Sequence, residues 1–173
     1  GAHIGGFIVG AIAAWFADRR SALLPADVGA PETAPLGRDA VRAALAAGLS
    51  EEAARAYFAL PASTARGALS AGEALELSLW LRRNGHAKAA LTLLRRVMGE
   101  APRGAAPAEA YALAGEILFE ALGQPTAAYQ YLLAALESGL PPERVALVRR
   151  DLAAIEDLQK RRLGRLRSSP PWQ

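Results

Sequence analysis

The chain has 173 residues, of which 52% are apolar and only 6% aromatic, and its formal net charge is +3. This length suits one domain, or a small domain with an appendage, and the apolar fraction is enough for a sizeable core. Cysteine is absent, which excludes disulfides and thiolate metal sites. A charge excess this small does not by itself indicate a nucleic-acid partner.

Residues 1–17, GAHIGGFIVGAIAAWFA, contain no Asp, Glu, Lys or Arg. As a helix they would be about 26 Å long, slightly less than the roughly 30 Å hydrocarbon thickness of a bilayer. Trp15 and Phe16 stand where interfacial aromatics belong, and Arg19 and Arg20 follow at once, which marks the cytoplasmic side by the positive-inside rule. We therefore expect a transmembrane helix over residues 1–20. The alternative is a buried helix of a soluble protein.

The chain starts at Gly1, within this apolar stretch, and no basic region precedes it as in a secretory signal. We therefore expect the sequence to be part of a longer polypeptide. Residues 21–37 hold three prolines and two glycines, a composition that breaks regular structure and indicates a linker.

From residue 38 to residue 167 the pattern is helical, because apolar residues recur at steps of three and four and no segment alternates with period two. The predicted apolar stripes are Ala87, Ala90, Leu91, Leu94, Val97 and Met98; Ala110, Leu113, Ala114, Ile117, Leu118 and Ala121; and Ala128, Tyr131, Leu132 and Ala135. A last stripe of Val145, Val148, Leu152 and Ile155 predicts a final helix that caps the array. We expect residues 168–173 to be a disordered tail.

The helices recur with a shift along the chain. Gly85 and Gly123 begin similar segments at an offset of 123 − 85 = 38, and a fainter copy begins at Gly48, at an offset of 85 − 48 = 37. A helix, a turn with Gly and a second helix with small residues near its start resembles the tetratricopeptide repeat, whose period is about 34. We expect antiparallel helix pairs stacked as a solenoid, so the predicted fold class is all-α.

The end of the final helix, KRRLGRLR, carries five basic residues: Lys160, Arg161, Arg162, Arg165 and Arg167. A solvated helix face accounts for them, and attraction to an anionic cytoplasmic leaflet is the functional alternative. Nucleic acid is disfavoured, because no aromatic residues are interleaved for base stacking.

His3 is an ionisable residue within the predicted span, and such residues indicate function. Counted back from Asp18 along a helix, it would lie roughly 8 Å below the far face of the membrane. Gly6 and Gly10 form a pair of small residues that lets another helix pack closely. Because His3 and Gly6 share a helix face, the imidazole would point toward that neighbouring helix. There it would be able to act as a general base toward a hydroxyl.

The stretch AHIGGFIVG resembles the last core transmembrane helix of the rhomboid intramembrane serine proteases. The resemblance implies that His3 is the catalytic histidine of a Ser–His dyad, and that Gly6 and Gly10 form the groove for the helix that bears the serine. In that family the serine lies in a Gly-x-Ser-Gly motif on an earlier helix. No serine of this chain lies in such a motif, so the fragment alone is expected to be inactive.

The resemblance therefore implies the C-terminal part of an intramembrane endopeptidase that cleaves in or near transmembrane segments of protein substrates. The expected protein is integral to the lipid bilayer, and its helical-repeat domain is cytoplasmic and binds a protein or peptide. The alternative is a non-enzymatic, membrane-tethered scaffold. The other histidine, His86, is expected in a solvated turn. We expect no metal site and no cofactor, because no ligand spacing and no phosphate-binding glycine loop is found.

Overall fold

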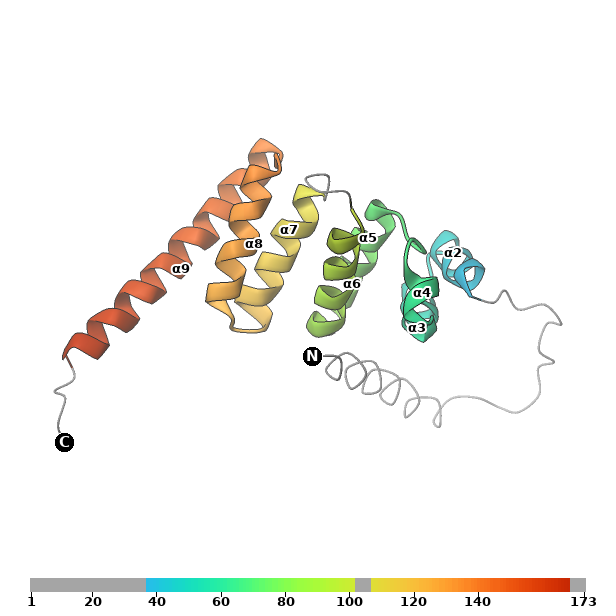
Figure 1. Cartoon of the computed structure of the whole chain (residues 1–173), viewed down its shortest axis with the longest axis horizontal. Coiled ribbons are helices and arrows are strands. Elements are labelled where there is room, and N and C mark those ends of the chain that lie inside the picture. Colours follow the sequence, from blue (N-terminus) through green and yellow to red (C-terminus); the bar gives the residue numbers. More distant parts are fainter. Residues whose placement is uncertain (1–36, 102–106, 169–173) are drawn as a thin grey trace, which may run out of the picture. The chain divides into compact units, whose positions relative to one another are not determined.

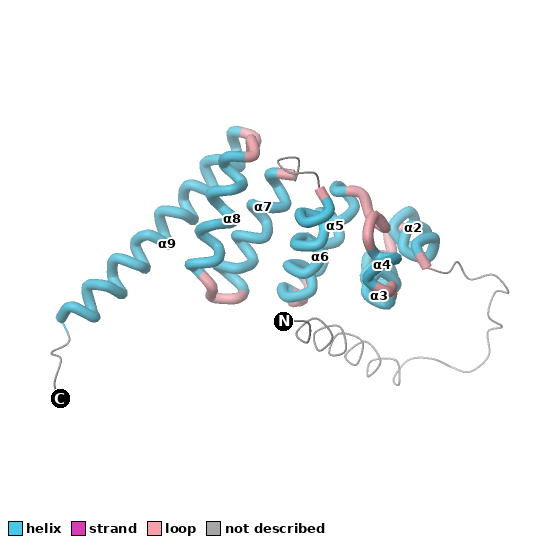
Figure 2. Tube along the Cα trace, viewed as in Figure 1, coloured by secondary structure: helices cyan, strands magenta, loops and turns pink. Residues whose placement is uncertain are grey.

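The computed structural model describes residues 37–101 and 107–168, and every regular element in these ranges is a helix (Figures 1 and 2). The all-α prediction is therefore confirmed for the described part of the chain. Among the described helices, none combines the length and the apolar character that a bilayer span requires. The predicted transmembrane helix, the linker up to residue 36 and the tail from residue 169 lie outside the described residues.

The described residues divide into two compact units at the Asn84–Gly85 bond. The first unit contains four helices, which are α2 (Arg38–Ala46), α3 (Ser50–Ala59), α4 (Ala62–Ala65) and α5 (Ala71–Arg83). Helix α3 packs against both α2 and α5. The buried core between these helices consists of Val41, Ala53, Ala54, Tyr57, Ala65, Ala68, Ala74, Leu77 and Leu81.

Two sets of hydrogen bonds hold the ends of helices in the first unit. Arg38, at the start of α2, donates from Nε to the Thr64 carbonyl at 2.7 Å and from a terminal nitrogen to the Arg66 carbonyl at 2.6 Å. Helix α5 begins with a capping box, in which the Glu73 N–H donates to Ser70 Oγ and the Ser70 N–H donates to Glu73 Oε2. This pair satisfies backbone donors that a helix start otherwise leaves open.

The second unit contains α6 (Ala87–Glu100), α7 (Ala108–Glu116), a single wide turn η2 (Ile117–Ala121), α8 (Pro125–Glu137) and α9 (Pro142–Ser168). Helix α7 packs closely against α8, and α6 and α9 pack against α7 and α8 respectively. Figure 1 shows α9 running on past the ends of its neighbours α7 and α8. This matches the burial pattern, because Ile155 is the last buried residue of α9 in the part whose side chains are described.

The predicted apolar stripes mostly lie in the core, with one error. Ala121 is exposed, although the stripe of α7 predicts it to be buried. The cause is the π-type turn η2, in which the Leu122 N–H donates to the Ile117 carbonyl five residues back. A π turn holds more residues than the 3.6 of an α-helix, so the positions that follow leave the expected face.

The three glycines of the sequence recurrence have the same local conformation. Gly48, Gly85 and Gly123 have φ values of 72°, 81° and 60°. Each precedes a helix, namely α3, α6 and α8. Glycine reaches this left-handed region without the strain that a Cβ would add. The alanine five residues after each glycine, Ala53, Ala90 or Ala128, is 0% exposed.

Candidate functional site

The histidine and glycines that the sequence singles out are not part of the described geometry. His3, Gly6 and Gly10 lie in residues 1–36, outside the described residues. His86 lies directly before α6, where it is partly buried and has an interaction partner. The candidate sites that the structure itself provides are therefore polar clusters on the helical units.

The first cluster surrounds a shallow hollow in the first unit, between the α2–α3 turn and α5. Its volume is about 320 Å³, and Arg42, Glu73 and Glu76 are its charged lining residues. Hydrogen bonds from the backbone and side chain of Ser70 hold the pKa of Glu73 below its ordinary value, and the positive charge of Arg42 adds to this effect. Because the capping box already engages Glu73, we assign this carboxylate a structural role.

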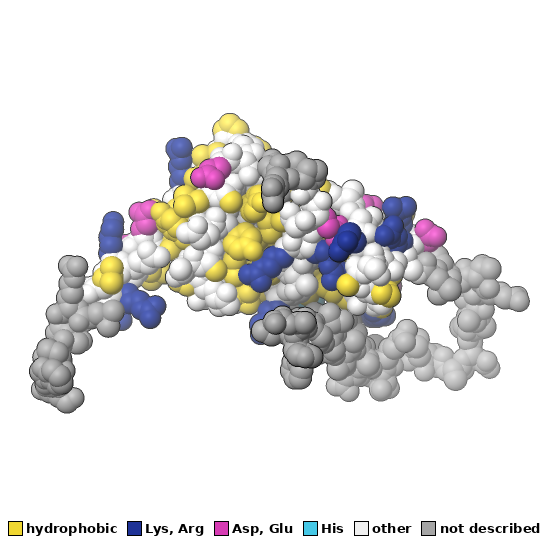
Figure 3. Space-filling view, viewed as in Figure 1, with side chains coloured by type: hydrophobic (Ala, Val, Ile, Leu, Met, Phe, Trp, Pro, Cys, Tyr) yellow, Lys and Arg dark blue, Asp and Glu magenta, His cyan; other side chains and the backbone are white. Residues whose placement is uncertain are grey.

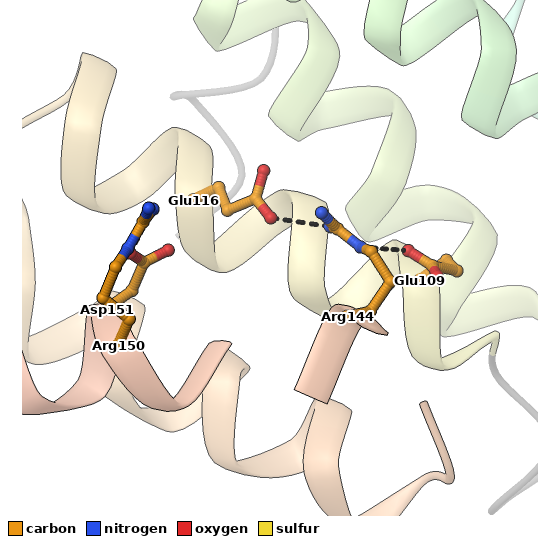
Figure 4. Close-up of polar contacts among 5 residues, drawn as sticks. All are labelled: Glu109, Glu116, Arg144, Arg150 and Asp151. Atoms are coloured by element: carbon orange, nitrogen blue, oxygen red, sulfur yellow. Dashed lines mark hydrogen bonds and ion pairs between the residues drawn. The ribbon is translucent and has the colours of Figure 1, made fainter. Parts of the chain in front are cut away.

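The second cluster joins α9 to α7 in the second unit (Figure 4). Arg144 donates from Nε to Glu109 Oε2 at 3.1 Å and from a terminal nitrogen to Glu116 Oε1 at 2.6 Å. Burial lowers the pKa of Arg144, but the attraction and hydrogen bonds of Glu116 and then Glu109 outweigh it, and the net direction is upward. The Glu116 side chain is only 11% exposed, and burial of a carboxylate is tolerable where a cation is paired with it.

Two further pairs involve α9. Arg150 donates twice to Oδ1 of its neighbour Asp151, at 3.1 and 3.0 Å, and the Asp151 side chain is 7% exposed. The Tyr129 hydroxyl on α8 donates to Glu156 Oε1 at 3.1 Å, and this hydrogen bond raises the pKa of the phenol. All these carboxylates have a cationic or phenolic partner. The contacts of Arg144 and the Tyr129–Glu156 pair join α9 to its neighbours α7 and α8, whereas the Arg150–Asp151 pair lies within α9.

The third cluster is a surface to which α6, α7 and α8 each contribute one residue: Arg95, Tyr111 and Tyr131. We call it the tyrosine–arginine surface. The two rings have centroids 6.4 Å apart and are tilted by 44°. Arg95 Nε donates to the Tyr131 hydroxyl at 3.1 Å, while the guanidinium carbon lies 5.8 Å from the ring centroid. Arg95 therefore binds the hydroxyl end of Tyr131, and it also lies within cation–π distance of the ring.

The tyrosine–arginine surface has the residue types of a protein-binding site. Both tyrosines are partly buried and Arg95 is exposed. The space-filling view shows apolar side chains gathered over α7 and α8, with basic side chains beside them (Figure 3). Tyrosine and arginine carry much of the energy at protein interfaces, since they offer large contact areas together with polar groups.

The sequence pattern does not indicate this surface. Tyr131 falls on a predicted buried stripe, and Arg95 and Tyr111 belong to none of the predicted stripes. The offset of 38 pairs Leu94 with Leu132, so no repeat position relates Arg95 to either tyrosine. The three residues meet only because α6 and α8 both pack against α7.

The described clusters contain no evident catalytic arrangement. Residues 37–101 and 107–168 hold no group of three or more His, Asp or Glu side chains that could bind a metal ion. In comparisons with known proteins, no family model matches the chain, and neither a curated protein nor a solved structure is similar to it. The class that the fold defines is thus an all-helical protein of two compact units.

Proposed function

We propose that this chain is the C-terminal part of a rhomboid-like intramembrane serine endopeptidase, with its helical units on the cytoplasmic side. The observation that carries the proposal is the stretch AHIGGFIVG, in which His3 is followed by the small-residue pair Gly6 and Gly10 within seventeen residues that lack charge. A histidine is costly inside a membrane, and a functional role is the usual reason for its presence.

In the proposed mechanism, His3 is a general base that removes the proton from a serine hydroxyl on a neighbouring helix. The serine oxygen attacks the peptide carbonyl in or beside the substrate's membrane span, and His3 then donates the proton to the leaving amine. Gly6 and Gly10 allow the serine-bearing helix to approach closely enough for this transfer. The chain carries no Gly-x-Ser-Gly motif, so the proposal requires the nucleophile to lie upstream of Gly1.

Replacement of His3 in the whole protein tests this mechanism. We expect His3→Ala to lower the rate of cleavage of a transmembrane substrate by at least about 10²–10⁴-fold, the usual contribution of a positioned base, while membrane insertion is retained. The chain has a second histidine, His86, and His86→Ala is the matched control that keeps its activity. Undiminished cleavage by the His3→Ala protein would disprove the assignment.

The helical units are proposed to be a tetratricopeptide-like interaction domain. Support comes from the recurrence of a left-handed glycine before α3, α6 and α8, each followed by a buried alanine. We further propose that the tyrosine–arginine surface binds a peptide that carries a carboxylate next to an apolar side chain. The carboxylate would pair with the Arg95 guanidinium and the apolar group would pack on the tyrosine rings.

A selection of displayed peptides on the full chain tests this binding role. We expect the selected peptides to be acidic and to lose affinity about tenfold or more when Arg95 is replaced by Gln, the loss of one charge-assisted hydrogen bond. Arg83→Gln is the control, because Arg83 is also an exposed helical arginine. Peptides without acidic residues, or equal losses in both variants, would contradict the proposed surface.

A non-enzymatic, membrane-tethered scaffold is the second candidate function, and the tyrosine–arginine surface favours it as much as it favours a protease domain. The coding sequence upstream of Gly1 separates the two candidates. Further hydrophobic spans with a Gly-x-Ser-Gly motif are expected for the protease, and their absence would leave the scaffold.

A further inference from the structure

The distal half of α9 exposes both apolar and basic side chains. Among residues 156–165 none is buried, and Leu158 and Leu163 are 50% and 57% exposed. These are two of the four large apolar residues that are exposed in the described part of the chain. Within the part of the chain that the structure describes, the two leucines are therefore exposed to a partner.

The two exposed leucines of this segment lie on either side of the direction in which the helix is packed. At 100° per residue, Leu158 and Leu163 bound an arc of roughly 140° that contains the direction of the buried Ile155. Lys160, Arg161 and Arg165 fall outside the arc, on either side of it, whereas Gln159 and Arg162 fall within it.

The charge of the chain is concentrated on the same segment. Residues 158–168 contain five basic residues and no acidic residue, whereas the whole chain has a net charge of +3. The rest of the chain therefore sums to 3 − 5 = −2. The nearest carboxylate on this part of the helix, Asp157, pairs with Arg161 at 2.6 Å. Figure 3 shows basic side chains around an apolar group on this exposed end of α9.

We propose that residues 158–168 bind the surface of an anionic lipid membrane. Exposed leucines among lysine and arginine residues are typical of helices that lie in the membrane interface, where the apolar side chains enter the headgroup region and the cations meet lipid phosphates. The leucines distinguish this partner from nucleic acid, since the segment has no aromatic residue for base stacking. The inference does not depend on the proposed proteolysis.

The absence of cysteine from the chain makes a direct test possible. A polarity-sensitive fluorophore is attached to the full-length chain at Gln159→Cys, which is exposed and lies between the two leucines. Vesicles of phosphatidylcholine with about one-third phosphatidylserine are expected to shift its emission to the blue, and roughly 0.5 M salt to reverse the shift. The same label at the exposed Thr126 on α8 is expected to give no shift.

Neutralisation of the basic residues tests the proposal quantitatively in the same vesicle assay. Each basic residue near an anionic surface strengthens binding about fivefold. The triple variant Lys160→Gln, Arg161→Gln, Arg165→Gln is therefore expected to weaken the vesicle response about 100-fold. The matched control is Arg83→Gln, Lys88→Gln, Arg149→Gln, which removes the same charge from exposed positions elsewhere and is expected to keep the response.

Four results would overturn the proposal. The first two are no emission shift with anionic vesicles and an equal loss of the shift in both triple variants. The third is a shift that appears without vesicles when the protein concentration is raised, and the fourth is an equal shift with a nucleic-acid duplex. The third result would indicate a second copy of the chain as the partner, and the fourth a nucleic acid. Because the His3→Ala variant is expected to give the same shift, failure of the protease proposal and failure of this one are distinguishable.

Discussion

Gly115 allows α7 and α8 to lie against each other. A Cβ atom built at this position would be 2.6 Å from Cγ and Cδ2 of Leu132 and 3.3 Å from the carbonyl oxygen of Ala128. The first two distances are too short for any real Cβ contact, and Leu132 is itself fully buried. Glycine is therefore required here by close approach and not by an unusual φ angle.

We predict that Gly115→Ala lowers the free energy of unfolding by about 1–3 kcal/mol, the usual cost of overpacking a core. The higher helix propensity of alanine, roughly 1 kcal/mol, offsets only part of this cost. Gly72→Ala in α5 is the control, because a Cβ there meets nothing within 4 Å, and it is expected to be neutral or stabilising. Urea denaturation followed by circular dichroism measures both. Equal stability of the two variants would contradict the packing argument.

At the scale of elements, Arg144 fixes the start of α9 to α7. We predict that Arg144→Met lowers the free energy of unfolding by about 1–3 kcal/mol, since the nearly buried Glu116 loses its ion pair with Arg144. The control is Arg161→Met. The side chains of Arg161 and its partner Asp157 are 69% and 56% exposed, and an ion pair this exposed contributes no more than about 0.5 kcal/mol to stability. Thermal and urea unfolding compare the variants, and a similar loss in both would argue against a special role for Arg144.

The stability of the folded state depends on pH through the capping box of α5. The folded state lowers the pKa of Glu73 through its hydrogen bonds from Ser70. The stabilisation is therefore complete above the pKa of Glu73 in the unfolded chain and is lost as the pH falls through its lower value in the folded chain. We predict that Ser70→Ala costs about 1 kcal/mol at neutral pH and less in acid. Carboxyl NMR titration of Glu73 in both proteins measures the effect, and an unchanged pKa in the variant would refute it.

At the scale of the whole molecule, the buried core of the second unit ends before α9 does. Ile155 is 0% exposed, while no residue from Glu156 to Arg165 is buried. We predict that deletion of residues 160–173 changes the free energy of unfolding by less than about 0.5 kcal/mol. A chain that ends at Arg150 also lacks Leu152 and Ile155 and is expected to lose more than about 3 kcal/mol. A large loss in the first deletion would show that the distal helix supports the fold.

Much of the helical architecture could be read from the sequence because it depends on local rules. The steps of three and four, the glycine turns and the absence of alternation all concern neighbours within a few residues. The stripe of α8 is an example, since Ala128, Leu132 and Ala135 are 0% exposed as predicted. Ala121 is the exception, because the wide turn η2 was not apparent from a pattern that assumes a regular α-helix throughout.

The sequence by itself determined an all-helical chain, the places where glycine turns interrupt it, and the distinctive composition around His3, all of which are local. Only the tertiary structure decided that Arg95, Tyr111 and Tyr131 form one surface and that Glu116 is buried against Arg144. These contacts join residues 20 to 36 positions apart, and helix packing, not sequence spacing, brings such residues together.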